Sequence, residues 1–132
     1  MSRICLDTSA YSQLRRAHPE AKRTIDEATE VLVPVITLGE LRAGFRAGVR
    51  ERENERVLAA FLNEPSVRVL DVDDLASRHY AELAAELRRA GTPLPANDIW
   101  IAALALREGA TVLTFDEDFR RLTRVGLILL KP

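Results

Sequence analysis

The sequence contains few residues of the kinds that crosslink proteins or carry nucleophilic catalysis. It has one cysteine, Cys5, and two histidines among its 132 residues. A single cysteine excludes a disulfide framework within the chain, and its position in an apolar segment predicts a packed thiol rather than a reactive one. His18 lies in a turn beside a proline and His79 on the apolar face of a predicted helix, so we expect both histidines to be structural.

Long apolar runs are also missing. No segment approaches the roughly 20 consecutive apolar residues that a membrane-spanning helix requires. The N-terminus lacks the hydrophobic core of a signal peptide. The composition, 47% hydrophobic and 30% charged, is that of an ordinary globular protein. We therefore expect one domain spanning residues 1–132, located in the cytoplasm and making no membrane contact.

The net charge of −1 shows no excess of basic residues. A protein that binds nucleic acid usually has such an excess, so the overall charge does not favour this function. The arginines are locally concentrated, and the candidates for a phosphate contact are Arg42, Arg46 and Arg50. The guanidinium group suits phosphate through its planar set of donors. Glutamates are interleaved between residues 51 and 55, however, and a solvated helical face explains the same segment equally well.

Short apolar segments alternate with helical patterns along the whole chain. The predicted strands are residues 3–6, 31–36, 67–70, 111–115 and 127–130. Strands that are separated by helices form parallel sheets, because a parallel pair needs a crossover connection. The sequence therefore predicts an α/β fold with a parallel sheet and helices on both of its faces.

One predicted helix is apolar on every side. Residues 99–106 show no polar face, which is typical of a helix buried in the centre of a domain. Asn97 is a good capping residue at its start, and Gly109 is placed to end it in the left-handed conformation. Asp98 therefore lies on the first turn of a buried helix. Taken alone, this carboxylate could simply complement the helix dipole.

Three further carboxylates are expected at the same edge of the sheet. Asp7 and Asp116 directly follow predicted strands. Glu40 follows strand 31–36 within the first turn of a helix, where it would form a capping box with Thr37. Each has a local explanation, as a helix cap, a capping-box partner or a turn residue. The carboxyl ends of parallel strands nevertheless meet at one edge, where ligands of open α/β folds bind.

Carboxylates that converge in this way need a counter-charge. Two like charges about 4 Å apart repel by roughly 4 kcal/mol at an effective dielectric constant near 20. No lysine or arginine stands at any of the four junctions. A hard divalent cation such as Mg²⁺ or Mn²⁺, which prefers oxygen ligands, resolves the repulsion and indicates phosphoryl chemistry.

Four segments carry a resemblance to a known family. They are Leu6-Asp7-Thr8-Ser9, Thr37-Leu38-Gly39-Glu40-Leu41, Asn97-Asp98-Ile99-Trp100-Ile101-Ala102-Ala103 and Thr114-Phe115-Asp116-Glu117-Asp118-Phe119. In this order, and in a chain of this length, they resemble a PIN-domain ribonuclease, and more narrowly the VapC-type toxins of type II toxin-antitoxin systems. The resemblance covers essentially the whole chain. It departs from the family at Phe115, where a small or basic residue is frequent.

The resemblance implies both a fold and a site. The fold is a PIN-like five-stranded parallel sheet flanked by helices on both faces. The implied catalytic set is Asp7, Glu40, Asp98 and Asp116, of which Asp7, Asp98 and Asp116 are the metal ligands. Thr8, Asn97, Thr114 and Asp118 are expected to support them. Either Asp116 or Asp118 could be the fourth acid, and Asp116 is preferred because it directly ends its strand.

The implied activity is endonucleolytic cleavage of RNA that depends on Mg²⁺ or Mn²⁺, with a metal-activated water attacking the phosphodiester. The implied partners are an RNA substrate, a VapB-like antitoxin whose C-terminal segment fills the groove leading to the acids, and a second copy of the chain in a homodimer. Arg42, Arg46 and Arg50 are the candidates for contacting RNA or the antitoxin.

Three alternatives stay open at this stage. The chain could be an RNA-processing PIN nuclease without an antitoxin. It could be a receiver-like phosphoacceptor, with Asp71 as the acceptor and Lys131 near the end of the last strand. It could also be a non-catalytic binding module in which the acids only cap helices. This last alternative predicts no gain in melting temperature when divalent metal is added.

Overall fold

The structure is a computed structural model that describes residues 2–132. Its strands are β1 (Arg3–Leu6), β2 (Glu30–Pro34), β3 (Val67–Leu70), β4 (Thr111–Thr114) and β5 (Leu127–Leu129). Its helices are α1 (Thr8–Arg15), α2 (Pro19–Glu27), α3 (Val35–Ala47), α4 (Glu51–Leu62), α5 (Asp74–Ala90) and α6 (Ala96–Glu108), with a 3₁₀ helix, η1 (Glu117–Arg121), after β4.

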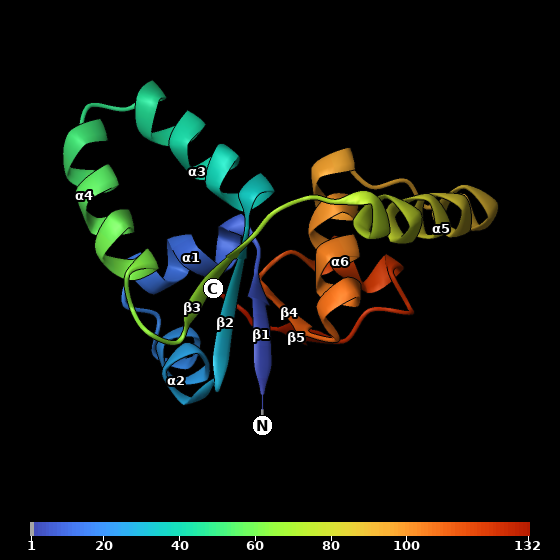
Figure 1. The fold of residues 1–132 in the computed structure, drawn as a ribbon, viewed down its shortest axis with the longest axis horizontal. Coiled ribbons are helices and arrows are strands. Elements are labelled where there is room, and N and C mark those ends of the chain that lie inside the picture. The colour runs from blue at the N-terminus through green and yellow to red at the C-terminus, as the bar shows by residue number, and fades with distance from the viewer. Residues whose placement is uncertain (1) are drawn as a thin grey trace.

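The five strands form one parallel sheet in the order β3-β2-β1-β4-β5. Alternate side chains of β1 point to opposite faces, as the period of a strand requires. Cys5 packs with residues of α5 and α6 on one face, and Ile4 and Leu6 pack with residues of α1 to α4 on the other. Figure 1 shows α5 and α6 on one side of the strands and the α3–α4 pair on the other. The predicted α/β fold with five parallel strands is confirmed.

Helix α6 is the buried helix expected from its apolar pattern. Ile99 and every residue from Ile101 to Ala105 are buried. Gly109 ends the helix with φ at 63°, a left-handed conformation that glycine adopts at little cost. No helix within residues 2–132 combines the length and the apolarity needed to cross a membrane.

Two helix starts differ from the prediction. Helix α3 begins at Val35, directly after Pro34, so strand β2 is shorter than the predicted 31–36. Thr37 therefore lies inside the helix, and its hydroxyl donates to the carbonyl oxygen of Leu6 at 2.9 Å instead of capping. Similarly, α6 begins after Pro95, and Asn97 is its second residue rather than its cap. The fixed φ of proline suits a position next to a helix start, and this preference overrides the side-chain capping signal.

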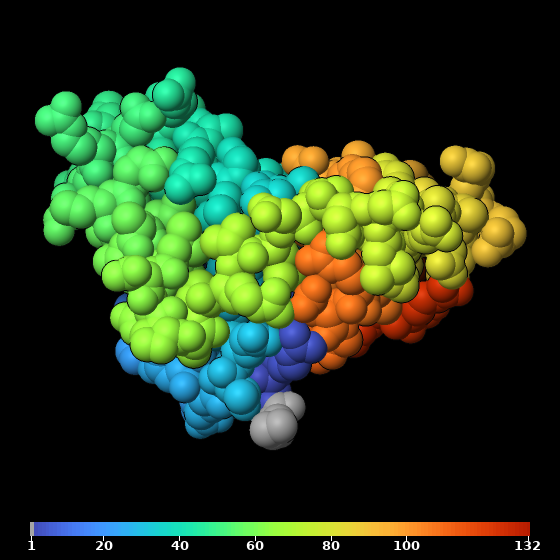
Figure 2. Space-filling view, viewed as in Figure 1, coloured from blue at the N-terminus to red at the C-terminus, as the bar shows by residue number. Residues whose placement is uncertain are grey.

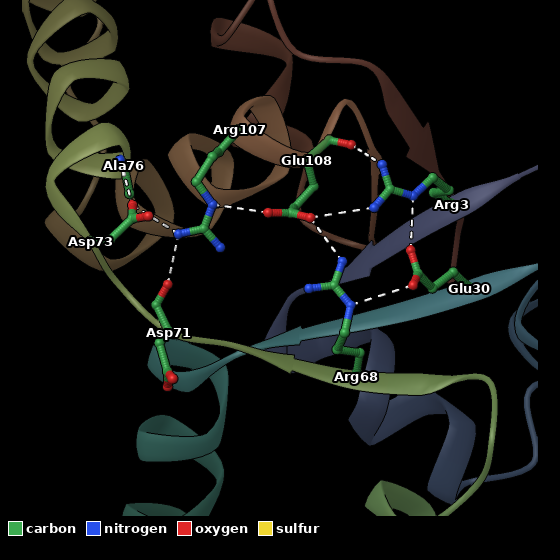
Figure 3. A network of polar contacts seen from close by, with 8 residues as sticks. All are labelled: Arg3, Glu30, Arg68, Asp71, Asp73, Ala76, Arg107 and Glu108. Carbon is green, nitrogen blue, oxygen red and sulfur yellow. Dashed lines mark hydrogen bonds and ion pairs between the residues drawn. The ribbon is translucent and has the colours of Figure 1, made fainter.

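The amino ends of the strands are joined to the end of α6 by a network of ion pairs (Figure 3). At its centre the Glu108 carboxylate accepts from Arg68 at 2.8 Å, from Arg3 at 3.3 Å and from Arg107 at 2.9 Å. Glu30 bridges Arg3 and Arg68. Arg107 continues the network to Asp73, the cap of α5. The centre of the network lies near the amino ends of β1 and β2, and Arg107 extends it to the segment that follows the carboxyl end of β3.

Candidate metal centre

Asp7 lies at the carboxyl end of β1 and caps helix α1. Its Oδ1 accepts from the backbone N–H of Ala10 at 2.9 Å and from the Ser9 hydroxyl at 2.7 Å, and its Oδ2 accepts from the Thr114 hydroxyl. The side chain is buried. Burial raises the pKa of Asp7, and the three hydrogen bonds oppose that rise. Asp7 is therefore held rigidly between the ends of β1 and β4.

Ser9 and Thr114 connect Asp7 to the segment that carries Asp116. The Thr114 hydroxyl accepts from the backbone N–H of Asp116 at 2.9 Å, and the Ser9 hydroxyl accepts from the N–H of Phe115, also at 2.9 Å. Each hydroxyl thus donates to Asp7 and accepts from the loop after β4. The sequence prediction included Thr114 but missed Ser9. The signal for Ser9 was its place in the cluster of capping residues that follows β1.

Glu40 lies on α3 and is held by donors from two other helices. Thr8 on α1 donates its hydroxyl to Oε1 at 2.5 Å, and the Asn97 amide on α6 donates to Oε2 at 3.3 Å. Both oxygens of the carboxylate therefore have a partner. The predicted supporting residues Thr8 and Asn97 both contact Glu40.

The negative charges of all the other predicted acids act on the pKa of Asp98. Its pKa is raised to about 6, first by burial and then by the negative charges of Asp116, Glu40, Asp7 and Asp118, in that order. Carboxylates from four elements therefore lie close enough together to disfavour the ionised form of Asp98.

Asp116 and Asp118 differ in their surroundings. Asp116 caps η1 and accepts from the N–H of Asp118 at 2.9 Å. Asp118 is paired with Arg121 at 3.3 Å. Of the four acids, Asp116 raises the pKa of Asp98 the most and Asp118 raises it the least. This difference favours Asp116 as the fourth acid.

No arginine, lysine or histidine in the described part of the chain forms an ion pair with Asp7, Glu40, Asp98 or Asp116. Among residues 2–132, no group of three or more aspartate, glutamate, histidine or cysteine side chains is arranged to hold a metal ion. Mg²⁺ keeps several of its water ligands and is usually bound by only one or two carboxylates. The oxygen-only donor set and its missing counter-charge therefore fit a partly hydrated divalent cation.

In the space-filling view, the outline of the molecule dips between α3 and the start of α6 (Figure 2). Glu40 and Asp98 belong to the two helices that flank this dip.

The arginines proposed from the sequence lie on the α3–α4 pair. Arg42 is paired with Glu55 at 3.0 Å and Arg46 with Glu51 at 3.1 Å. Arg50 is exposed, directly before the first residue of α4. The interleaved glutamates thus pair with two of the three arginines across the two helices.

Comparisons with known proteins agree with the fold and the order of the motifs. A family model described as PIN domain matches residues 4–125, which include all four carboxylates. Ribonuclease VapC5 of Mycobacterium tuberculosis is 36% identical over 120 residues, covering 89% of this chain and 85% of the relative. The tRNA(fMet)-specific endonuclease VapC of Salmonella typhimurium is 30% identical over 130 residues, covering 96% and 97%. The structure of DNA-bound VapBC from Salmonella typhimurium matches with a TM-score of 0.85 at 27% identity, covering 97% of this chain and 98% of that chain.

Proposed function

The chain belongs to the PIN-domain family, and we propose that it is the RNA-cleaving toxin of a toxin-antitoxin pair. The observation that carries this proposal is the gathering of Asp7, Glu40, Asp98 and Asp116 without a cationic partner in the described part of the chain, which also raises the pKa of Asp98. Such a site is unfavourable for folding unless it binds a cation. Structural stability alone therefore gives no reason for its presence, whereas phosphodiester cleavage does.

Divalent-metal dependence is a property of the PIN nuclease family, and we propose Mg²⁺ or Mn²⁺ as the ion. Asp7, Asp98 and Asp116 are its proposed ligands. A bound divalent cation supplies Lewis-acid stabilisation of the phosphate charge and activation of water. The residues of the chain then have separate tasks. Ser9 and Thr114 fix the orientation of Asp7, while Thr8 and Asn97 fix that of Glu40 beside Asp98.

The substrate is proposed to be RNA, as the names of the two ribonuclease relatives state for those proteins. The partner is proposed to be a VapB-like antitoxin, because the similar Salmonella structure is a VapBC complex. Co-purification with the product of a neighbouring small reading frame would distinguish this proposal from an RNA-processing nuclease without an antitoxin. The homodimer implied by the resemblance stays a prediction.

The receiver-like alternative does not fit the topology. Asp71 follows β3 and Lys131 follows β5, and these strands form the two opposite edges of the sheet. Four intervals between strands, each about 4.8 Å, place the two ends roughly 19 Å apart. The two residues that suggested a phosphoacceptor site therefore do not share one.

The test is cleavage of labelled single-stranded RNA by the purified protein. We expect cleavage with Mg²⁺ or Mn²⁺, none in excess EDTA, and none by the Asp98→Asn variant. Asp71→Asn is the matched control, since it removes an exposed aspartate outside the acid cluster and should cleave normally. Full activity of Asp98→Asn, or activity that persists in EDTA, would overturn the proposal.

A further inference from the structure

A second feature of the surface lies beside the acid cluster. A hollow of about 570 Å³ opens between the end of α5 and the segment that follows η1, and its lining is Glu86, Arg89, Ala90, Arg121, Thr123 and Arg124. We call it the arginine hollow. In Figure 2 the end of α5 and the red segment after β4 lie side by side at the right of the molecule. Half of the lining residues are arginines from two different elements.

These arginines are available to an anion to different degrees. Arg89 has no ion pair within residues 2–132. Arg124 pairs with Glu82 at 2.8 Å and also with Glu86, and all three side chains are partly exposed. Exposed ion pairs of this kind are worth at most about 1 kcal/mol each. A phosphate that takes two hydrogen bonds from a guanidinium can therefore replace them.

The hollow is connected to the acid cluster through Arg121. This side chain pairs with Asp118 at 3.3 Å and donates to the carbonyl oxygen of Pro93 at 2.8 Å, in the connector that leads to α6. Asp118 is one of the charges that act on Asp98. A polyanion that extends from the acids past Asp118 therefore reaches Arg121, which lines the arginine hollow.

We propose that the arginine hollow binds the phosphate backbone of the RNA on one side of the cleavage position. The inference rests on the proposed function, since it assumes that RNA reaches the acids. Phosphate contacts of this kind position a nucleic acid without reading its sequence. An acidic protein segment fits less well, because Ala90 is the only apolar side chain in the lining and a protein interface needs a buried apolar centre.

The test compares two variants with the same loss of charge. Arg89→Gln/Arg124→Gln removes two guanidinium groups of the hollow and spares Arg121, which touches the acid cluster. Arg23→Gln/Arg52→Gln removes two exposed arginines elsewhere. Binding of a fluorescein-labelled single-stranded RNA of mixed sequence is measured by anisotropy in EDTA, at several salt concentrations. We expect the hollow variant to bind at least roughly tenfold more weakly at low salt, with a salt slope smaller by about 1.4, and the control variant to resemble the wild type.

Equal affinity and slope in the two variants would overturn the inference, as would wild-type protein that binds no RNA. A hollow variant that binds RNA normally but no longer retains polyglutamate would assign the hollow to an acidic protein segment instead. Circular dichroism and the melting temperature confirm that each variant is folded. Cleavage by the wild type is assayed in parallel. If the wild type cleaves RNA and the hollow variant binds RNA normally, only the role of the hollow is rejected. If the wild type does not cleave RNA, the proposed function is rejected.

Discussion

The Asn97 amide donates to the Glu40 carboxylate at 3.3 Å, which connects the first turn of α6 to α3. The other oxygen of Glu40 accepts from Thr8 at 2.5 Å. Three helices that are distant in sequence therefore fix one carboxylate. Because Asp98 follows Asn97 directly, the same contact sets the position of Glu40 relative to Asp98. Asn97 thus acts on the site through Glu40.

Replacing Asn97 by alanine is expected to reduce activity more than stability. The side chain is exposed, so its loss should change the free energy of unfolding by no more than about 0.5 kcal/mol. Loss of a group that orients a metal-site carboxylate typically costs about 10- to 100-fold in metal affinity or activity. RNA cleavage rates at several Mg²⁺ concentrations, with urea unfolding, test this. Asn63→Ala, at the exposed end of α4, is the control, and an Asn97→Ala variant as active as this control would contradict the positioning role.

Asp98 should make the metal-free protein less stable as the pH rises. Its folded pKa of about 6 lies above the ordinary 3.8, so the folded state binds the proton more tightly than the unfolded state does. The contribution of Asp98 to stability therefore falls between about pH 4 and pH 6 and is constant above that range. Asp98→Asn removes the charge, so in EDTA the variant should melt at a higher temperature than wild type at pH 7.5 and show a flatter pH profile. Asp71→Asn should follow the wild-type profile. A lower melting temperature for Asp98→Asn at pH 7.5 would show that the acids do not repel one another.

Adding divalent metal should reverse this effect. A ligand at a hundredfold excess over its dissociation constant stabilises the folded state by about 2.7 kcal/mol, which corresponds to a rise of several degrees in melting temperature. The rise should be larger at pH 7.5 than at pH 5, because protons compete with the metal for the carboxylates. Differential scanning fluorimetry with Mg²⁺, Mn²⁺ and EDTA measures it. An equal rise in Asp98→Asn, or none in the wild type, would support the alternative in which the acids only cap helices.

The positions of the acids were easier to predict than their contacts. Asp7 and Asp116 follow strands, and the parallel sheet brings strand ends to one edge whatever the side chains do. The partners of Glu40 could not be read in this way. Thr8 and Asn97 lie 32 and 57 residues from it, and their hydrogen bonds depend on how three helices pack. The local spacing of Thr37 and Glu40 indicated a capping box instead, and that prediction was wrong.

The arginines illustrate the same limit. The segment from residue 42 to 56 offered both cations and glutamates, and its sequence allowed either a phosphate contact or a solvated face. Pairing between Arg42 and Glu55 requires α3 and α4 to lie side by side, which local periodicity does not specify. The arginine hollow was not predicted because its members come from residues 89 and 121–124, which are brought together only by the packing of α5 beside η1. RNA contact by Arg42, Arg46 and Arg50 stays a prediction.

Thr114→Val should weaken both the fold and the site. The buried hydroxyl donates to Asp7 and accepts from the N–H of Asp116, and valine has nearly the same shape but can do neither. Each buried partner left unpaired costs about 1–3 kcal/mol. Cleavage should fall because Asp7 loses one of the donors that orient it, and Thr114→Ser should restore much of both properties. Urea unfolding and RNA cleavage rates test this. A Val variant that unfolds at the wild-type urea concentration would refute the role of the hydroxyl.

Glu108→Gln should lower stability without changing the intrinsic cleavage rate. The carboxylate contacts Arg3, Arg68 and Arg107 and is only 17% exposed, so its loss should cost about 1–2 kcal/mol, more than a typical exposed ion pair. The hydrogen bond from Arg68 holds the pKa of Glu108 below its ordinary value of 4.5, so this contribution is present above about pH 4.5 and is lost as the pH falls further. Urea unfolding at pH 7 and pH 4 should therefore show a smaller difference between the variant and the wild type at the lower pH.

Glu64→Gln, which changes an exposed glutamate outside the network, is the control for this prediction. Since the Glu108 carboxylate contacts Arg3, Arg68 and Arg107 and none of the acids of the site, cleavage by folded Glu108→Gln protein at 25 °C should match the wild type. A tenfold loss of cleavage without unfolding would mean that the two ends of the sheet are coupled.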